Sequence, residues 1–235
     1  MAKTSSRARS DQERPSGKAP ARAAPAARNG KGRTNDPAAT QANILEVATR
    51  EFAEHGFTGA RIDAIAAGTR TSKRMIYYYF GSKEGLYEAV LLEYYRRLRK
   101  AESQIELDDL PPLEAVRRLT ESTFDYHVNN ADVVRLVMVE NLAKGRHISE
   151  LAGLPALNSA LICALQRICD RGAKDRVMRK VDATQLYTSI AALSFFNVSN
   201  RYTFSALFQT DMTSAKAVAE RKREIAAMVL RYVSP

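Results

Sequence analysis

The chain has 235 residues, of which 45% are hydrophobic and 26% charged, proportions that are ordinary for a soluble globular protein. Lys and Arg number 36 against 26 Asp and Glu, so the formal net charge is +10. Two cysteines exclude a disulfide framework and a four-cysteine zinc site, and no apolar run approaches the ~18–20 residues that a membrane helix needs. We therefore expect a soluble, cytoplasmic, basic protein that spans no membrane.

Residues 1–35 carry most of the positive charge. They hold nine Lys and Arg and two Asp and Glu, a net +7 of the total +10. The segment contains Pro15, Pro20 and Pro25 but no Ile, Leu, Val or aromatic residue, so we expect a disordered basic tail. We favour a solubilising role, with an arm that contacts nucleic acid through charge alone as the alternative. The prolines and the missing apolar stripe argue against a transit peptide.

A second concentration of positive charge lies inside the predicted helical region. Residues 57–83 contain five basic residues and one acid, a net +4, whereas residues 36–56 contain one basic residue and four acids. This contrast indicates one basic face on a small structural unit.

The first predicted helix begins at Asp36-Pro37, because Asp is a good N-cap and Pro suits the first helical position. Its apolar residues recur at helical spacing, and Gly56 is the expected stop. The stripe consists of Ile44, Leu45, Ala48 and Phe52.

Three further helices are predicted at short intervals. The second begins near Arg61 and ends before a break at residues 68–71. Ser72 is the expected N-cap of the third, which runs to about Phe80. A fourth restarts after Gly81-Ser82 and reaches about Ile105.

Beyond a linker-like break at residues 108–112, the apolar spacing predicts five more helices and one short helical turn. Their approximate ranges are 112–129, 132–144, 155–171, 182–200 and 214–232, with the short turn near 147–151. No segment alternates convincingly with a period of two. The predicted fold class is therefore all-α, with a small N-terminal unit and a larger C-terminal one.

The second and third helices have the features of a helix-turn-helix. They are short, closely joined, and the third is rich in basic and hydroxyl side chains. It reads Ser72-Lys73-Arg74-Met75-Ile76-Tyr77-Tyr78-Tyr79-Phe80. At 100° per residue the apolar side chains can share one face, which leaves the basic ones on the outer side.

With its flanks included, this region resembles the TetR family of bacterial transcriptional regulators. The resemblance covers about residues 36–93 and is most specific in the run Tyr77-x-x-Phe80-x-x-Lys83-x-x-Leu86. It implies a three-helix DNA-binding head over residues 36–82, joined by helix four to a ligand-binding and dimerisation domain within residues 83–235. It further implies that Tyr77 and Lys83 contact phosphates. The residues implied to face the groove are Ser72, Lys73, Arg74, Tyr78 and Tyr79.

The turn departs from the family pattern. Arg70 occupies the position of the usual turn glycine, Thr71 that of the usual valine, and Ala60-Arg61 that of a Thr/Ser pair. A non-glycine residue in a left-handed turn costs on the order of 1 kcal/mol, so the turn is either mildly strained or differently shaped. Arg61 and Arg70 add cations, and we expect them to strengthen phosphate contacts unless they simply point to water.

The C-terminal region resembles the family less specifically. Residues 140–148 and 200–204 are similar to the branch that governs catabolism of nitrogen heteroaromatics, which implies a heteroaromatic acid as effector. Polar and aromatic residues within apolar helices are candidate ligand contacts, although each alone is more often a core residue. These candidates are Tyr126, His127, Arg135, Glu140, Asn141, Asn197, Asn200 and Arg201. The apolar stripes of the last two predicted helices are consistent with the dimer interface that the family implies.

No metal site, cofactor or catalytic group is expected. The three histidines are widely spaced, and no phosphate-binding loop, nucleophile elbow or paired-carboxylate pattern is present. The sequence thus predicts a homodimeric repressor that binds a palindromic operator and releases it when a small molecule binds. The alternatives are an architectural, non-specific DNA-binding protein that uses the tail and head, and a ligand-binding or enzymatic bundle with a vestigial head.

Overall fold

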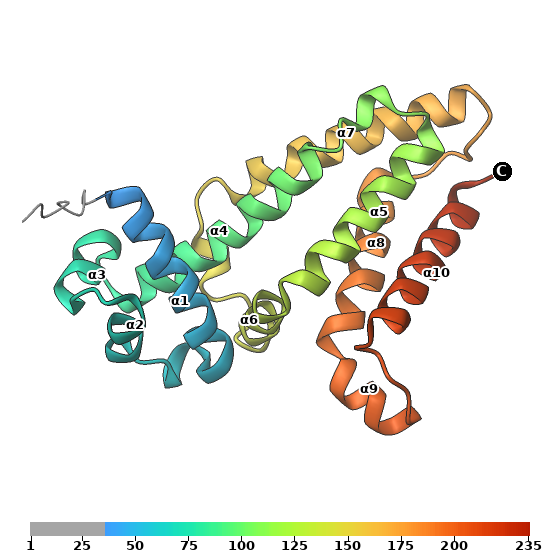
Figure 1. Cartoon of the computed structure of the whole chain (residues 1–235). Helices are drawn as coiled ribbons and strands as arrows, with labels where there is room; N and C mark the ends of the chain where they lie inside the picture. The colour runs from blue at the N-terminus through green and yellow to red at the C-terminus, as the bar shows by residue number, and fades with distance from the viewer. Residues whose placement is uncertain (1–35) are drawn as a thin grey trace, which may run out of the picture. The chain divides into compact units, whose positions relative to one another are not determined.

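The computed structural model describes residues 36–235, so the predicted disordered basic tail over residues 1–35 lies outside the described residues. Within the described range the chain is all-α, as predicted (Figure 1). The helices are α1 (Pro37–Gly59), α2 (Ile62–Thr69), α3 (Lys73–Phe80), α4 (Lys83–Ser103), α5 (Pro112–Asn129), α6 (Ala131–Leu142), α7 (Leu154–Lys174), α8 (Ala183–Ser199), α9 (Arg201–Phe208) and α10 (Ala215–Val233). Two 3₁₀ turns, η1 (Leu107–Asp109) and η2 (Ile148–Glu150), complete the described elements. None of the described helices combines the length and apolar character needed to cross a bilayer.

α1 begins as the sequence predicts but ends differently. The Asp36 carboxylate accepts hydrogen bonds from the backbone N–H groups of Ala38 and Ala39, at 3.0 and 3.2 Å. Gly56 leaves the helical conformation at φ 66° and ψ 176°, yet a further turn continues to Gly59. The predicted stop at Gly56 is therefore a kink inside the element.

The head is built around one apolar cluster shared by α1, α2, α3 and the first half of α4, to which α6 adds Leu136. Ile44 and Phe52 of α1, Ile65 of α2 and Ile76 of α3 are fully buried in it. Leu86 begins the contribution of α4, which includes Tyr87, Val90 and Leu91. The short α2 and α3 are thus held by burial of their apolar faces, since helices of eight residues are marginal on their own.

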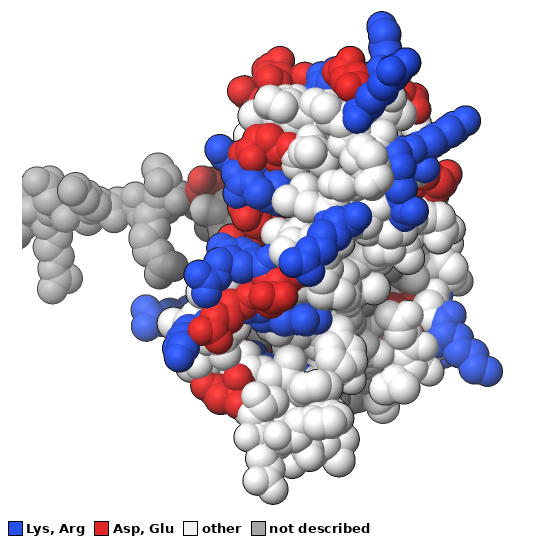
Figure 2. Space-filling view, turned by 90° about the vertical axis from the view of Figure 1, so that its right-hand side faces the viewer, with Lys and Arg blue, Asp and Glu red and all other residues white. Residues whose placement is uncertain are grey.

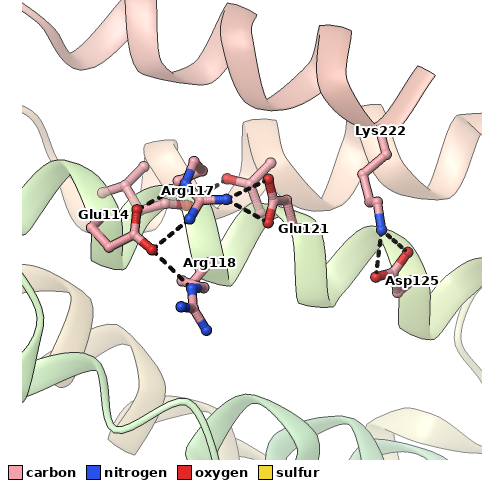
Figure 3. Close-up of polar contacts among 8 residues, drawn as sticks. Glu114, Arg117, Arg118, Glu121, Asp125 and Lys222 are labelled. Atoms are coloured by element: carbon pink, nitrogen blue, oxygen red, sulfur yellow. Dashed lines mark hydrogen bonds and ion pairs between the residues drawn. The ribbon is translucent and has the colours of Figure 1, made fainter. Parts of the chain in front are cut away.

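α5, α7, α8 and α10 form the body around a second cluster, in which α5 is flanked by the other three helices (Figure 1). Phe124 of α5, Ile190 of α8 and Ile225 of α10 are fully buried there. The outer face of α5 is polar: Arg117 donates to Glu121 at 2.9 Å and also to Glu114 (Figure 3). Lys222 of α10 pairs with Asp125 of α5 at 2.9 Å, which adds a polar contact between these two helices (Figure 3).

α9 is the helix that the sequence does not predict. Asn200, at φ −107° and ψ 5°, ends α8, and the chain continues as α9 without a longer loop. α9 has no buried residue, although its sequence includes Tyr202, Leu207 and Phe208. Sequence-based prediction of a helix relies on apolar residues that recur on one buried face. The apolar side chains of α9 are exposed within the protomer, so this pattern does not mark the helix.

Candidate nucleic-acid interface and ligand cavity

The turn between α2 and α3 has the left-handed geometry that its sequence disfavours. Arg70 lies at φ 55° and ψ 31°. Its N–H donates to Ala67 O at 3.3 Å and that of Thr71 donates to Ala66 O at 3.2 Å, which is the Schellman arrangement at a helix end. The fold therefore keeps the glycine-type turn and accepts the strain of an Arg there.

α3 presents its polar side chains outward. Ser72 caps the helix by accepting from Met75 N–H at 3.3 Å, and Ile76 anchors the opposite face in the head core. Lys73 forms an ion pair with Asp63 of α2, which holds the start of α3 against its neighbour. Tyr78 is the most exposed of the three consecutive tyrosines, with 76% of its surface exposed. These features suit a helix that enters a DNA groove.

The start of α4 is fixed to both α1 and α3. Lys83 donates to Thr58 O at 3.2 Å, and its ammonium lies 5.1 Å from the centre of the Phe57 ring. A Cβ atom on Gly85 would lie 2.2 Å from the backbone oxygen of Phe80, so only glycine permits this approach of α4 to the end of α3. The Tyr-x-x-Phe-x-x-Lys-x-x-Leu run therefore also has structural roles.

The structure places all ten predicted DNA contacts in α2, α3 and their flanks, on accessible positions. Arg61, Arg70, Ser72, Lys73, Arg74, Tyr77 and Tyr78 are exposed, and Thr71, Tyr79 and Lys83 are half-buried. Arg61 is held at the start of α2 because its backbone N–H donates to Glu51 at 2.9 Å. Among residues 36–235 its side chain, like those of Arg70 and Arg74, forms no ion pair, and it can reach a phosphate or a base edge.

A cavity of about 440 Å³ lies in the body between α4, α5, α6 and α8. Its wall is largely aromatic and aliphatic, with a few polar groups, which is the usual composition of a small-molecule site. The lining residues used below are Tyr94, Tyr95, Arg99, His127, Val137, Asn141, Tyr187, Ala191 and Phe195. Here we call it the α4–α8 cavity. A second cavity, of about 650 Å³, lies between α4, η1 and α7, and Arg99 lines both.

Arg99 belongs to a buried polar network at the edge of the α4–α8 cavity. Its side chain is 10% exposed, pairs with Glu102, and donates to the Tyr187 hydroxyl at 2.8 Å. Glu102 also accepts from Tyr187 at 2.9 Å and from Thr123 at 3.2 Å. Burial raises the pKa of Glu102 above its ordinary value, while Arg99 opposes that rise. The Nε atom of Arg99 is buried without a hydrogen-bond partner within residues 36–235.

His127 is the predicted ligand residue that the structure places most clearly in the α4–α8 cavity. It is 4% exposed and its ring meets Phe195 edge-on at 5.6 Å. Burial, with a smaller contribution from the nearby charge of Arg99, lowers the pKa of His127 to about 4, so the imidazole is neutral at pH 7. Its Nδ1 atom is buried and has no hydrogen-bond partner in the described part of the chain.

The other predicted ligand residues are dispersed. Asn141 lines the α4–α8 cavity, and together with Asn200 it lines a neighbouring groove between α6 and α8. Tyr126 donates to Tyr94 O at 3.3 Å and lines a separate pocket toward α1. The remaining four lie outside these cavities: Arg135 is exposed, Glu140 and Asn197 are buried, and Arg201 stacks on Tyr202 at 4.7 Å.

α4 and Tyr187 supply a part of the cavity wall that the sequence did not predict. Tyr94, Leu98 and Glu102 are spaced by four residues and mark one buried face of α4, with Arg99 beside it. The charged residues Arg99 and Glu102, at the end of an apolar stripe, are the sequence feature that could have indicated this buried polar site. Its meeting with Tyr187, 88 residues from Arg99 in the chain, follows from the tertiary structure alone.

Comparison with known proteins decides the family. The model for the bacterial regulatory proteins of the tetR family matches residues 44–90, and that for the tetracyclin repressor-like C-terminal domain matches residues 112–229. The chain belongs to the TetR family. It is 36% identical over 193 residues to the HTH-type transcriptional repressor NicS of Pseudomonas putida, a match that covers 82% of this chain and 91% of that protein. It is 31% identical over 127 residues to the regulator RutR of Escherichia coli K12, covering 54% and 55% of the two chains.

Solved structures agree. A putative transcriptional regulator of Streptomyces coelicolor, SCO4942, superposes with a TM-score of 0.62 at 27% identity, over 83% of this chain and 99% of that one. A tetR-family regulatory protein from Rhodococcus RHA1 has a TM-score of 0.66 at 19% identity, covering 83% and 97%, and supports the fold. This TetR-family protein is thus a sequence-specific DNA-binding transcriptional regulator. The architectural alternative is not favoured, because the curated relatives are named as transcriptional repressors and regulators.

Proposed function

We propose that the protein is a homodimeric, one-component repressor that leaves its operator when a small molecule fills the α4–α8 cavity. In this proposal residues 36–82 bind DNA, and residues 83–235 bind the ligand and form the dimer. The observation that carries it is the geometry of α3, whose basic and tyrosine side chains are exposed while Ile76 anchors the opposite face. Each protomer places α3 in the major groove, and the two-fold axis of the dimer coincides with that of a palindromic operator.

The proposed DNA contacts divide into two classes. Ser72, Lys73, Arg74 and Tyr78, with Tyr79 at the edge, face the bases, and Arg74 is the strongest candidate for paired hydrogen bonds to a guanine. Tyr77 and Lys83, with Arg61, Arg70 and Thr71, flank them toward the phosphates. The first class determines sequence preference, and the second contributes affinity that falls steeply with salt concentration.

The proposed dimer interface uses the sides of α8 and α10 that face away from the body core. Phe196 of α8 and both Met228 and Tyr232 of α10 are exposed in the protomer. Figure 2 shows the side of the molecule on which α10 lies, where wide uncharged areas separate the charged residues, and its lower part is largely uncharged. Large exposed apolar areas rimmed by charges are typical of subunit interfaces.

The proposed effector is a heteroaromatic acid. Arg99, whose Nε has no hydrogen-bond partner among the described residues, offers a hydrogen bond to a carboxylate, and the neutral His127 suits a ring nitrogen or hydroxyl. Tyr94, Tyr95 and Phe195 supply aromatic faces and edges against which a planar ring can pack. The resemblance of residues 140–148 and 200–204 to the branch that governs nitrogen-heteroaromatic catabolism supports the same class.

Release follows if the effector binds better to a conformation in which the two heads no longer match half-sites one helical turn (~34–36 Å) apart. α4 connects the two parts, since Leu86 and Tyr87 lie in the head core while Tyr94, Leu98 and Arg99 line the cavity. A difference of ~1–3 kcal/mol between the two conformations is enough to change operator affinity measurably.

The test is selection of bound fragments from random duplexes, with and without pyridine and pyrimidine carboxylates and with benzoate as the comparison. Arg74→Ala and Tyr78→Ala should erode sequence preference, and Lys83→Ala should weaken binding to all sequences about equally. Arg50→Ala is the control, because this exposed arginine of α1 already pairs with Glu46 at 2.9 Å. Equal loss of affinity for every sequence in all three head variants would contradict specific readout. A carboxylate that binds the body tightly and leaves operator affinity unchanged would contradict effector release.

A further inference from the structure

α6 forms a wall shared by the head core and the α4–α8 cavity. Leu136 is fully buried in the head cluster, and Glu140, one helical turn later on the same face, is 2% exposed. Val137 and Asn141, also one turn apart, line the cavity. A ligand that displaces Val137 and Asn141 therefore also displaces Leu136 and Glu140, because one rigid helix carries both pairs.

Glu140 binds α6 to the chain that follows it. Its carboxylate accepts from the backbone N–H of His147 at 2.7 Å and of Ile148 at 3.0 Å, and it pairs with His147 Nδ1 at 3.0 Å. Three hydrogen bonds to one buried carboxylate are costly to break, since a buried charge that loses its donors is left without hydration.

The reversal between these residues is tight. Lys144 and Gly145 both have positive φ, at 59° and 70°, and Gly145 N–H donates to Glu140 O at 2.9 Å. α6 and the turn up to Ile148 are thus cross-linked at both the backbone and the carboxylate of Glu140. They should move as one body.

His147 connects α6 and its following turn to the DNA-binding head. Its ring is 4.7 Å from the ring of Phe57 at the end of α1 and 4.8 Å from that of Tyr87 in α4. Phe57 in turn packs under the ammonium of Lys83, and the adjacent carbonyl of Thr58 accepts from it at 3.2 Å. The contact path therefore leads from the cavity wall to a residue proposed to hold the DNA backbone.

We propose that Glu140 and His147 are positioning residues that transmit occupancy of the α4–α8 cavity to the DNA-binding head through Phe57 and Tyr87. This inference rests on the proposed function and specifies how its ligand site is coupled to its DNA site. The hydroxyl of Tyr87 is buried beside Glu140, and burial together with the Glu140 carboxylate raises the pKa of Tyr87. A shift of α6 therefore moves Glu140 relative to this hydroxyl and His147 relative to Phe57.

The test uses a cavity-filling substitution in place of a ligand. Ala191→Phe adds a ring from α8 into the α4–α8 cavity opposite α6. We expect it to weaken binding to the selected operator at least tenfold, measured by fluorescence anisotropy, with the protein still folded. In a His147→Ala background the same substitution should change operator affinity less than threefold. Glu140→Gln, which keeps the shape but removes the charge, should reduce the coupling in the same direction.

Ser149→Ala is the matched control, since Ser149 is exposed in the same turn and should leave the tenfold effect intact. His147→Phe keeps an aromatic ring against the head and should retain more of the coupling than His147→Ala. An Ala191→Phe effect of equal size in the wild-type and His147→Ala backgrounds would overturn the inference, as would no effect of Ala191→Phe on the wild type. The proposed function fails separately, if the wild-type protein selects no operator.

Discussion

Arg70 offers a direct test of how the turn of the helix-turn-helix is built. It holds a left-handed conformation, φ 55° and ψ 31°, that glycine adopts freely and that costs a residue with a Cβ atom about 1 kcal/mol. Arg70→Gly should remove this cost, whereas Arg70→Ala keeps it. Both substitutions remove the same exposed guanidinium.

The two variants should therefore separate stability from DNA binding. Arg70→Gly is expected to be more stable than Arg70→Ala by about 1 kcal/mol, which corresponds to ~2–4 °C in Tm for a chain of this size. Operator affinity should fall equally in both. If Arg70 contacts one phosphate in each protomer, the slope of log affinity against log salt concentration should flatten by about 0.9 per contact, or nearly two for a dimer.

Thermal unfolding at matched protomer concentration and operator titrations at several salt concentrations measure the two effects. Equal stability of Arg70→Gly and Arg70→Ala would refute the claim that this turn is strained. A salt slope identical to that of the wild type would instead refute a phosphate contact by Arg70.

Three further outcomes are expected. Burial lowers the pKa of His127 to about 4, so below about pH 6.5 the unfolded chain binds a proton that the folded chain does not bind. The free energy of unfolding measured in urea should therefore fall by about 2 kcal/mol from pH 7 to pH 5. His127→Gln should lack this part of the pH dependence. Gly85→Ala should destabilise the chain by ~1–3 kcal/mol in thermal unfolding and weaken operator binding, because its Cβ would meet the Phe80 backbone. Gly59→Ala is the control and should be tolerated, because its Cβ would make only an ordinary contact. Lys222→Ala should lower the free energy of unfolding in urea by at most ~1 kcal/mol, because its ion pair with Asp125 is partly exposed. A larger loss would contradict this expectation.

The head could be predicted closely because its signals are local. Asp36 and Ser72 cap helices through groups two or three residues away, and the apolar stripe of α1 is complete within that helix. The outward position of Arg74 and Tyr78 follows from the inward position of Ile76 and the helical period alone. What the sequence left open there was whether Arg70 would keep the left-handed turn.

The ligand candidates were predicted less well because convergence of side chains is not a local property. His127 and Asn141 meet in one cavity, but Glu140, next to Asn141 in the chain, instead accepts hydrogen bonds from the turn at His147 and Ile148. A polar residue in an apolar helix has the same sequence signature whether it binds a ligand or satisfies a buried backbone turn. The helical arrangement alone distinguishes these two roles.

The sequence by itself determined the all-helical class, the helix-turn-helix and the family, since these depend on spacing and capping within a few tens of residues. The tertiary structure decided which helices enclose the α4–α8 cavity, brought Arg99 against Tyr187, and seated His147 between Phe57 and Tyr87. These contacts depend on how the helices pack around two cores, and that packing reflects the burial of many apolar side chains at once.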